Sequence, residues 1–425
     1  MMQPNGKAVV LAPFWRLPSH VAVYRVERFV RWLQGEGVDV VLVRASSRDF
    51  VEQTPWGTEI SMRDPVSLYR EPGGPPLPAW RRRPNRLRRL AAMAVLTPDP
   101  LILWARRAAR HPTVLEHAAG ARWVIASSPP ESVHVGAAAL AARVGAKLVV
   151  DLRDGWLDEP LRSLVQTSRF HRWRERRLER RIISQAHRIF VTSEGWRQQL
   201  AQRYPGAVGK VGLLTNGYPP DGPGAVPGES AAHADERNTL ELCYAGQFTQ
   251  SRSTQHPRLL LEPLWLAARK GGRAACIDLV GHLSGEDVTE IAAWSPRFEE
   301  AGWSVRTHAP VPRAAILARL RRASGLLLLS ASESAVPSKL FEYIPAGRPI
   351  LAAASPTGAL WRLCRQIPQV FLTDYLRPEH SSPVLSAFLA ACAEREPAYG
   401  LPEQFTERYL RRRFLRDLEL APDDV

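Results

Sequence analysis

The sequence predicts an α/β protein built from two doubly wound parallel sheets, and three observations lead to this fold class. Short apolar, strand-like runs alternate with stretches of helical periodicity along most of the chain, which is the pattern of βαβ units. The chain has 425 residues, enough for two or three domains. Between residues 217 and 238 glycines, prolines and polar residues interrupt the pattern and divide it into two halves.

The first half, residues 1–216, is predicted to contain six strands separated by helical stretches. Apolar residues at helical spacing, for example Val26, Phe29, Val30 and Leu33, mark the helix between the first two strands. The predicted strands cover residues 8–12, 38–43, 123–126, 147–151, 188–192 and 211–214.

The second half, residues 239–400, repeats the alternation after the linker at 217–238. Its predicted strands cover residues 240–245, 275–280, 304–307, 326–329 and 349–352. In sheets of this kind ligands bind at the carboxyl ends of the strands, so we expect the loops of both domains to face a central cleft. Residues 401–425 form a separate arginine-rich, helical C-terminal segment.

Composition indicates a globular protein that binds anions. Hydrophobic residues make up 45% of the chain and charged residues 23%, while the formal net charge is +15, which favours phosphates, nucleic acid or an acidic membrane surface as partners. No CxxC pair occurs among Cys243, Cys276, Cys364 and Cys392, so we expect free thiols in a reducing compartment. Neither a signal peptide nor a run of eighteen apolar residues is present, so we expect a cytoplasmic protein.

The most informative segment is residues 337–350, which follow the leucine-rich strand at 326–329. A helix is predicted to start near Ser338, with Lys339 in its first turn and Glu342 three residues later. A helix N-terminus with a lysine beside it is typical of a phosphate site. The Glu342 carboxylate can accept hydrogen bonds from sugar hydroxyls. Phosphate and sugar recognised side by side indicate a nucleotide sugar.

The same segment, Pro-Ser-Lys-Leu-Phe-Glu-Tyr followed by Gly-Arg-Pro, resembles the nucleotide-binding element of GT-B glycosyltransferases, most closely family 4. The resemblance covers nearly the whole chain and implies the GT-B fold, in which two Rossmann-like domains face a central cleft. It implies that the first domain binds the acceptor and the second binds the nucleotide sugar. In GT-B proteins a C-terminal helix such as that of residues 401–425 often crosses back to the first domain, which the resemblance implies here as well. It also makes Ser338, Leu340 and Glu342 donor-binding residues and Lys339 a catalytic residue that stabilises the leaving diphosphate.

Further donor-side residues come from the same resemblance. Gly246 opens a loop that lies beside the donor diphosphate in the family, and Arg252 on that loop is the candidate second cation. Many members carry a glutamate that contacts the transferred sugar at the position occupied here by Ser334. Either the adjacent Glu333 replaces it, or Ser334 and backbone amides hold the sugar. No Asp-x-Asp is present, so we expect no metal ion and no cofactor.

Acceptor-side residues are predicted at the strand ends of the first domain. Ser19 and His20 stand where many members have paired glycines in the first loop, and Ser128 belongs to a Ser-Ser-Pro-Pro strand end. The Asp-Leu-Arg-Asp loop after the next strand carries Arg153 where the family often has histidine. Asp154 is the candidate that orients an acceptor hydroxyl, whereas Asp151 is expected to pair with an arginine and hold the loop.

These features together predict a retaining hexosyltransferase that moves a sugar from a nucleoside-diphosphate sugar. The predicted acceptor is a lipid-linked glycan precursor in cell-surface polysaccharide or glycolipid synthesis. Two alternatives stay open: a soluble small-molecule acceptor, and a non-catalytic GT-B-like subunit that binds a partner. An epimerase is disfavoured because its dense carboxylate and histidine set is missing, and nucleic-acid binding because the arginines lack a known reader fold.

Two basic stretches predict docking on an anionic membrane at its inner face. Nine arginines lie between Trp80 and Arg110, accompanied by apolar residues that include those at 101–104. A second cluster spans residues 169–188 and includes Phe170, Trp173, Leu178 and Ile182. Basic helices with apolar residues suit anionic lipid, although the same apolar residues equally suit a protein core.

Overall fold

The computed structural model describes residues 5–16, 21–65, 96–158, 168–218, 239–249, 253–394 and 399–420. The chain divides into two compact units. The first comprises Met1–Thr215 together with Arg411–Val425, and the second comprises Asn216–Leu410. Most of the predicted linker and the candidate residues Ser19, His20 and Arg252 lie outside the described residues, as do residues 66–95 of the first basic stretch.

The first unit contains a sheet of eight strands in the order β3-β4-β2-β1-β5-β6-β7-β8. All neighbouring strands pair in parallel except β3 and β4, which are antiparallel. The strands are β1 (Lys7–Leu11), β2 (Asp39–Ser46), β3 (Phe50–Thr54), β4 (Gly57–Arg63), β5 (Trp123–Ser128), β6 (Lys147–Leu152), β7 (Arg188–Val191) and β8 (Val211–Leu213). The order 2-1-5 at the centre is that of a doubly wound sheet.

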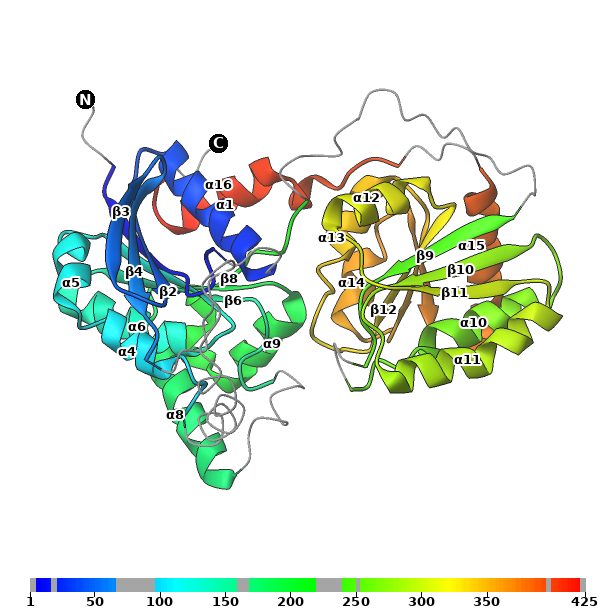
Figure 1. The fold of residues 1–425 in the computed structure, drawn as a ribbon, viewed down its shortest axis with the longest axis horizontal. Coiled ribbons are helices and arrows are strands. Elements are labelled where there is room, and N and C mark those ends of the chain that lie inside the picture. The colour runs from blue at the N-terminus through cyan, green and yellow to red at the C-terminus, as the bar shows by residue number, and fades with distance from the viewer. Residues whose placement is uncertain are drawn as a thin grey trace, which may run out of the picture. The chain divides into compact units, whose positions relative to one another are not determined.

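Helices cover both faces of this sheet. On one face the C-terminal helix packs against the first one: the ring of Phe414 stacks on that of Phe29 at 4.7 Å and contacts Phe190 of β7. Figure 1 shows α1 and α16 on that face and α4, α5 and α6 on the other. The helices are α1 (Val21–Gly35), α4 (Ile102–Ala108), α5 (Pro112–Ala118), α6 (Ser132–Val144), α8 (Arg169–Gln185), α9 (Glu194–Arg203) and α16 (Glu407–Asp417).

The second unit contains a parallel sheet of six strands in the order β11-β10-β9-β12-β13-β14. The strands are β9 (Leu240–Ala245), β10 (Ala275–Val280), β11 (Ser304–His308), β12 (Gly325–Ser330), β13 (Ile350–Ala354) and β14 (Val370–Asp374). The helices are α10 (Arg258–Ala268), α11 (Gly285–Glu300), α12 (Arg313–Arg322), α13 (Leu340–Tyr343), α14 (Ala359–Cys364) and α15 (Ser382–Ala393).

Successive residues of β12 point to opposite faces and so contribute to two separate cores. Leu327 and Leu329 pack with α10, α11 and α15, whereas Leu326 and Leu328 pack with α12, α13 and α14. This explains why the strand is a continuous leucine run: a strand buried on both faces has no polar side. The α/β class and the paired parallel sheets predicted from the sequence are thus confirmed.

Three strands, β3, β4 and β14, were not predicted, and one predicted helix is shorter than expected. β3 and β4 carry charged residues, among them Glu59, which is buried because it pairs with Arg44 and Arg16. The charged residues of a buried ion pair make a strand segment as polar as a loop in a hydrophobicity pattern. The helix expected from Ser338 to Gly347 consists of α13, a single turn, followed by a 3-10 turn at Ile344–Ala346 that ends at Gly347 in a left-handed conformation.

Candidate functional site

The side chain of Lys339 is the most unusual polar group in the second unit. It precedes α13, in the loop that follows the buried strand β12, and its amine is fully buried although the residue as a whole is partly exposed. Among the described residues the amine has no hydrogen-bonding partner; its nearest feature is the face of the Tyr244 ring, 4.0 Å away. Burial lowers the pKa of Lys339 to about 7, against an opposing effect of Glu342.

Glycine at position 246 creates the space in which this amine lies. Gly246 directly follows β9 and has φ +136°, a conformation that L side chains rarely adopt. A Cβ added there would lie 2.6 Å from the Lys339 amine. The loop after β9 and the loop before α13 therefore meet at a point where glycine leaves room for the amine. The donor-binding role of Gly246 stays a prediction.

The backbone around Lys339 offers less to an anion than the sequence suggested. The N–H of Leu340 donates to the Pro337 carbonyl at 3.1 Å, and the N–H of Phe341 donates to Ser338 at 3.1 Å. These two donors are occupied by the turn itself, and the Leu340 side chain is buried in the core. Because α13 is one turn long, its dipole is small. Positive charge at this site therefore comes mainly from the lysine side chain.

Glu342 has an ion-pair partner that the sequence analysis did not identify. Arg313, the first residue of α12, donates to Oε1 of Glu342 from Nε at 3.1 Å and from Nη2 at 2.9 Å. Both side chains remain about one-third exposed. The pair fixes the carboxylate while it still faces solvent. Nothing in the local sequence signals this partner, because Arg313 lies 29 residues away on another helix.

Glu333 and Ser334 lie in the loop between β12 and Lys339. The Ser332 hydroxyl accepts hydrogen bonds from the N–H groups of Ser334 and Ala335, at 3.3 and 3.0 Å, which makes a compact turn. Glu333 is exposed and its carboxylate accepts a hydrogen bond from the Thr357 hydroxyl at 2.9 Å. Ser334 is buried, and Ser338 is exposed beside Lys339. Neither arrangement decides which of the two residues contacts a sugar, so both stay predictions.

In the first unit a buried cation links three segments at the carboxyl edge of the sheet. Arg25 of α1 donates to both oxygens of Asp151, at 2.7 and 2.8 Å, and to the carbonyls of Leu214 and Thr215. Asp151 also accepts a 2.6 Å hydrogen bond from the Ser127 hydroxyl. Asp151 is fully buried and satisfied, so it holds the strand ends together, which is the role that the sequence analysis expected for it.

Arg153 holds the neighbouring Ser-Ser-Pro-Pro loop. Its Nε donates to the Ser128 carbonyl at 2.9 Å and its Nη2 to the Pro129 carbonyl at 3.0 Å, and burial lowers the pKa of this arginine. Asp154 is partly exposed, and no hydrogen bond or ion pair is found for its carboxylate among the described residues. Among the charged groups of this loop, Asp154 is thus the one whose carboxylate forms no hydrogen bond or ion pair with the described residues.

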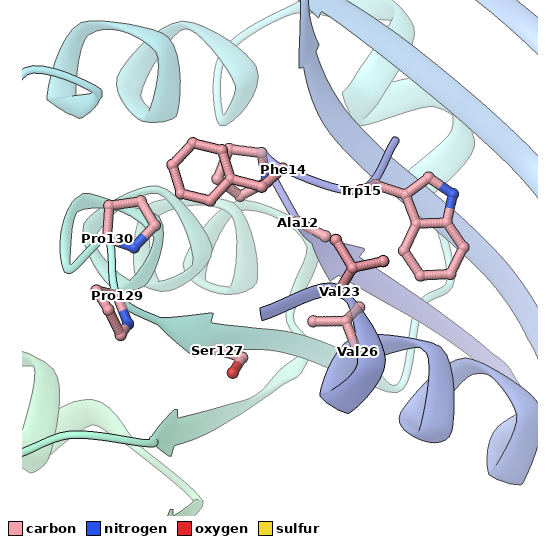
Figure 2. A pocket seen from close by; sticks show the side chains of 9 residues that line it. Ala12, Phe14, Trp15, Val23, Val26, Ser127, Pro129 and Pro130 are labelled. Atoms are coloured by element: carbon pink, nitrogen blue, oxygen red, sulfur yellow. The ribbon is translucent and has the colours of Figure 1, made fainter. Parts of the chain in front are cut away.

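A small apolar pocket, partly open to solvent, lies beside this network. Figure 2 shows its lining: the aromatic rings of Phe14 and Trp15, two valines of α1, and the prolines of the β5 loop around the hydroxyl of Ser127. The lining residues are Ala12, Pro13, Phe14, Trp15, Val23, Val26, Ser127, Pro129 and Pro130. The sequence analysis missed this pocket, because its walls come from the loop after β1, from α1 and from the end of β5 with its loop, and no single segment shows it.

In the described part of the chain, no group of three or more histidine, cysteine, aspartate or glutamate side chains is arranged to hold a metal ion. No helix there is both long and apolar enough to cross a bilayer. All four cysteines are buried free thiols.

The sequence and fold were compared with known proteins. Residues 22–217 match the family model described as a glycosyl transferase 4-like domain. Anabaena Alr3699/HepE, in complex with UDP and glucose, matches with a TM-score of 0.56 and 12% identity over 98% of this chain and 100% of that one. The lipopolysaccharide outer core galactosyltransferase WaaB matches with a TM-score of 0.54 and 12% identity over 97% and 99%.

An α,α-trehalose-phosphate synthase (UDP-forming) from Burkholderia vietnamiensis also matches, with a TM-score of 0.52 and 12% identity over 97% of this chain and 94% of that one. A comparison with curated protein sequences finds no significant match. At these identities the structural matches show the fold, which is GT-B, over nearly the full length of the chain.

Proposed function

We propose that this GT-B glycosyltransferase, whose residues 22–217 match a glycosyl transferase 4-like domain, transfers a sugar from a nucleoside-diphosphate sugar to a lipid-linked acceptor with retention of configuration. The observation that carries the donor half of the proposal is the buried amine of Lys339, which lacks a partner among the described residues. A buried cation without a counter-charge is costly unless a ligand supplies one. A diphosphate does so.

The proposed chemistry depends on stabilising the leaving diphosphate as its charge develops. The Lys339 amine is buried, and a preorganised cation stabilises negative charge far more in a buried environment than in water. Arg252, outside the described residues, stays the predicted second cation. With these groups as the counter-charge, the proposed mechanism is metal-independent. The similar Alr3699/HepE structure, which contains UDP and glucose, supports a donor of this class.

Donor recognition is assigned to the residues around Lys339. Glu342, held by Arg313, accepts hydrogen bonds from the ribose hydroxyls through the oxygen that the arginine does not occupy. Gly246 lets the donor phosphates approach the backbone closely. The exposed Ser338 is assigned to a further phosphate contact, while Glu333 and Ser334 remain the two candidates for the transferred sugar.

The acceptor half of the proposal rests on the apolar pocket and on Asp154. The pocket is lined by aromatic, valine and proline side chains, so it suits an apolar part of an acceptor better than a free sugar. Asp154, partly exposed, is assigned to orient the acceptor hydroxyl, and Ser128 and Arg153 shape the loop beside it. An acceptor with an apolar anchor and a hydroxyl fits a lipid-linked glycan precursor in cell-surface polysaccharide or glycolipid synthesis.

The test of the donor assignment is a panel of nucleotide sugars screened for thermal stabilisation, followed by turnover of the best one in EDTA. We expect one sugar nucleotide to stabilise the protein and to be hydrolysed slowly without an acceptor. Turnover in EDTA should equal turnover in Mg²⁺. Strict Mg²⁺ dependence would refute the metal-independent mechanism. Binding without any hydrolysis or transfer would favour a non-catalytic partner subunit.

The test of the acceptor assignment uses a matched pair of substitutions. Val26→Thr places a hydroxyl in the apolar pocket without a change in shape, whereas Val51→Thr makes the same change on exposed β3. The first should raise the KM for a polyprenyl- or lipid-linked acceptor severalfold and leave donor hydrolysis unchanged. The second should change neither. Equal KM values for both variants, with efficient transfer to a small soluble aglycone, would favour the soluble acceptor instead.

A further inference from the structure

The outward face of α8 is rich in arginine. The helix contains seven arginines in seventeen residues. Its buried face carries His171, Glu175, Glu179, Ile182 and Ile183, so both of its carboxylates point inward. Its exposed face therefore presents arginines with no acidic side chain among them.

The exposed residues form a single stripe along the helix. Arg169, Trp173, Arg176, Arg177 and Arg180 are all exposed, and at 3.6 residues per turn they fall within an arc of about 100°. Trp173 lies near the middle of that arc. The stripe faces away from the body of the unit, since the opposite arc supplies the buried residues. Five side chains thus share one continuous surface that no described element covers.

Two large aromatic side chains are exposed at the N-terminal end of the stripe. Phe170 is 64% exposed and Trp173 is 54% exposed. Their rings stack on each other with centroids 5.8 Å apart, and Arg174 and Arg177 lie over the two rings at 5.7 and 5.8 Å. Exposed aromatic pairs are costly in water, so a pair held between arginines indicates a surface that is covered during function.

The other basic stretch behaves differently where it is described. Of the apolar residues at 101–104, Leu101, Ile102 and Trp104 are buried in the core, and Arg107 pairs with Asp49. In α8 itself, Ile182 is buried and Leu178 is half-buried. The structure thus separates the described sequence candidates: Leu101, Ile102, Trp104 and Ile182 are core residues, whereas Phe170, Trp173 and the arginine stripe are exposed.

We propose that the Arg169–Arg180 stripe with Phe170 and Trp173 docks the enzyme on an anionic phospholipid surface. Arginines suit phosphate headgroups, and aromatic rings suit the boundary between headgroups and acyl chains. This deepens the proposed function, on which it rests for its purpose: docking brings a lipid-linked acceptor to the enzyme. Adsorption to lipid, however, is measurable without any turnover.

The same helix is tied to the loop that carries Asp154. On its buried side, Glu179 accepts hydrogen bonds from Arg203 at 3.1 Å and from the Tyr204 hydroxyl at 2.7 Å. Arg203 also pairs with Asp158, four residues beyond Asp154. A lipid surface bound to the outer face of α8 would therefore be held at a fixed position relative to the proposed acceptor site of the same unit.

The arrangement of the rings favours lipid over single-stranded nucleic acid. Nucleic-acid binders leave aromatic ring faces open so that bases can stack on them. Here the faces of Phe170 and Trp173 are directed toward each other and toward two guanidinium groups. Insertion into a lipid interface needs only exposed ring atoms, and more than half of each of these two residues is exposed.

The experiment measures co-sedimentation of the full-length protein with phosphatidylcholine vesicles that contain increasing phosphatidylglycerol. Binding of the wild type should rise with anionic lipid and fall with salt. Each arginine removed from the stripe should lower the partition coefficient of the protein between vesicles and water about fivefold at low salt. The variant R169Q/R176Q/R177Q/R180Q should therefore lose binding several hundredfold, and F170S/W173S should lose the part of binding that resists salt.

A matched control removes the same charge from the second unit. The variant R258Q/R322Q/R365Q/R377Q changes four exposed arginines there and should weaken binding less than tenfold. All three variants should keep the thermal stabilisation by nucleotide, which shows that they are folded. If the wild type binds vesicles but turns over no nucleotide sugar, the proposed function is refuted and the docking proposal is not.

Three results would overturn the docking proposal. The first is equal loss of binding in the control and the stripe variants, which would make adsorption a property of net charge. The second is no preference of the wild type for anionic vesicles at low salt. The third is binding to a single-stranded oligonucleotide at physiological salt that depends on the stripe, with no vesicle binding, which would assign the surface to nucleic acid.

Discussion

The amine of Lys339 lies 4.0 Å from the centre of the Tyr244 ring and, among the described residues, forms no hydrogen bond. Desolvation lowers the pKa of Lys339 to about 7, so the free enzyme at neutral pH holds a mixture of the charged and neutral forms. A bound diphosphate would favour the charged form. The buried amine therefore destabilises the free protein, and under the proposed function a bound anion offsets this cost.

Lys339→Met should stabilise the free protein and abolish its chemistry. Methionine fills the same space without a buried amine, so we expect a higher Tm at neutral pH. The gain should shrink between pH 7 and about 10.5, because only the unfolded wild type holds the proton in that range. Turnover should fall by about a hundredfold or more. A destabilised variant with full activity would contradict both statements.

Donor affinity should depend on pH through the same amine. Below pH 7 Lys339 is charged before the donor binds, so affinity should be constant. Above pH 7 binding must take up a proton, and affinity for a nucleotide sugar should fall by about tenfold per pH unit. Calorimetry in buffers of different ionisation enthalpy counts the proton directly. The variant Lys339→Met should show no such slope, and a wild-type affinity that is flat up to pH 9 would exclude this linkage.

Glu342→Gln should weaken donor binding while the fold survives. The neutral amide accepts ribose hydroxyl bonds less strongly than a carboxylate, and it also releases Arg313. We expect a loss of roughly tenfold in affinity for the nucleotide, measured by calorimetry, with a Tm close to that of the wild type because the pair is one-third exposed. The matched variant Arg313→Gln tests the supporting role. It should lower affinity less than Glu342→Gln does. Unchanged nucleotide affinity in Glu342→Gln would exclude the ribose contact.

Much of the second unit's site was predictable, because its residues are close in sequence. Lys339, Glu342 and the strand before them belong to one continuous string whose pattern already indicates a strand, a loop and a phosphate-binding turn. Sequence patterns work here because the strand, the loop and the turn are local structures. They failed for the length of α13, because Pro345 within the string limits the helix to one turn and a 3-10 extension.

The partners of these residues could not be predicted, since they come from distant elements. Arg313 reaches Glu342 from α12, and Tyr244 reaches Lys339 from β9. Strands that contain buried ion pairs could not be predicted for the same reason. From the sequence Glu59 is expected at the surface, whereas in the structure it is buried in an ion pair with Arg44. The sequence alone does not show whether a charged side chain contacts solvent, another side chain or a ligand. Its partner determines whether the residue belongs to the core, the surface or the site.

The two aspartates of the loop after β6 should respond to substitution in opposite ways. Asp151 is fully buried and holds Arg25, so Asp151→Asn should cost about 3–5 kcal/mol of unfolding free energy, because it leaves the arginine buried without a counter-charge. Asp154 is partly exposed, so Asp154→Asn should change stability by less than about 0.5 kcal/mol. If Asp154 orients the acceptor, its variant should lose transfer by at least about a hundredfold and keep donor affinity. Urea unfolding and transfer assays on the two variants separate these roles, and full transfer by Asp154→Asn would leave the acceptor hydroxyl without an assigned partner in this loop.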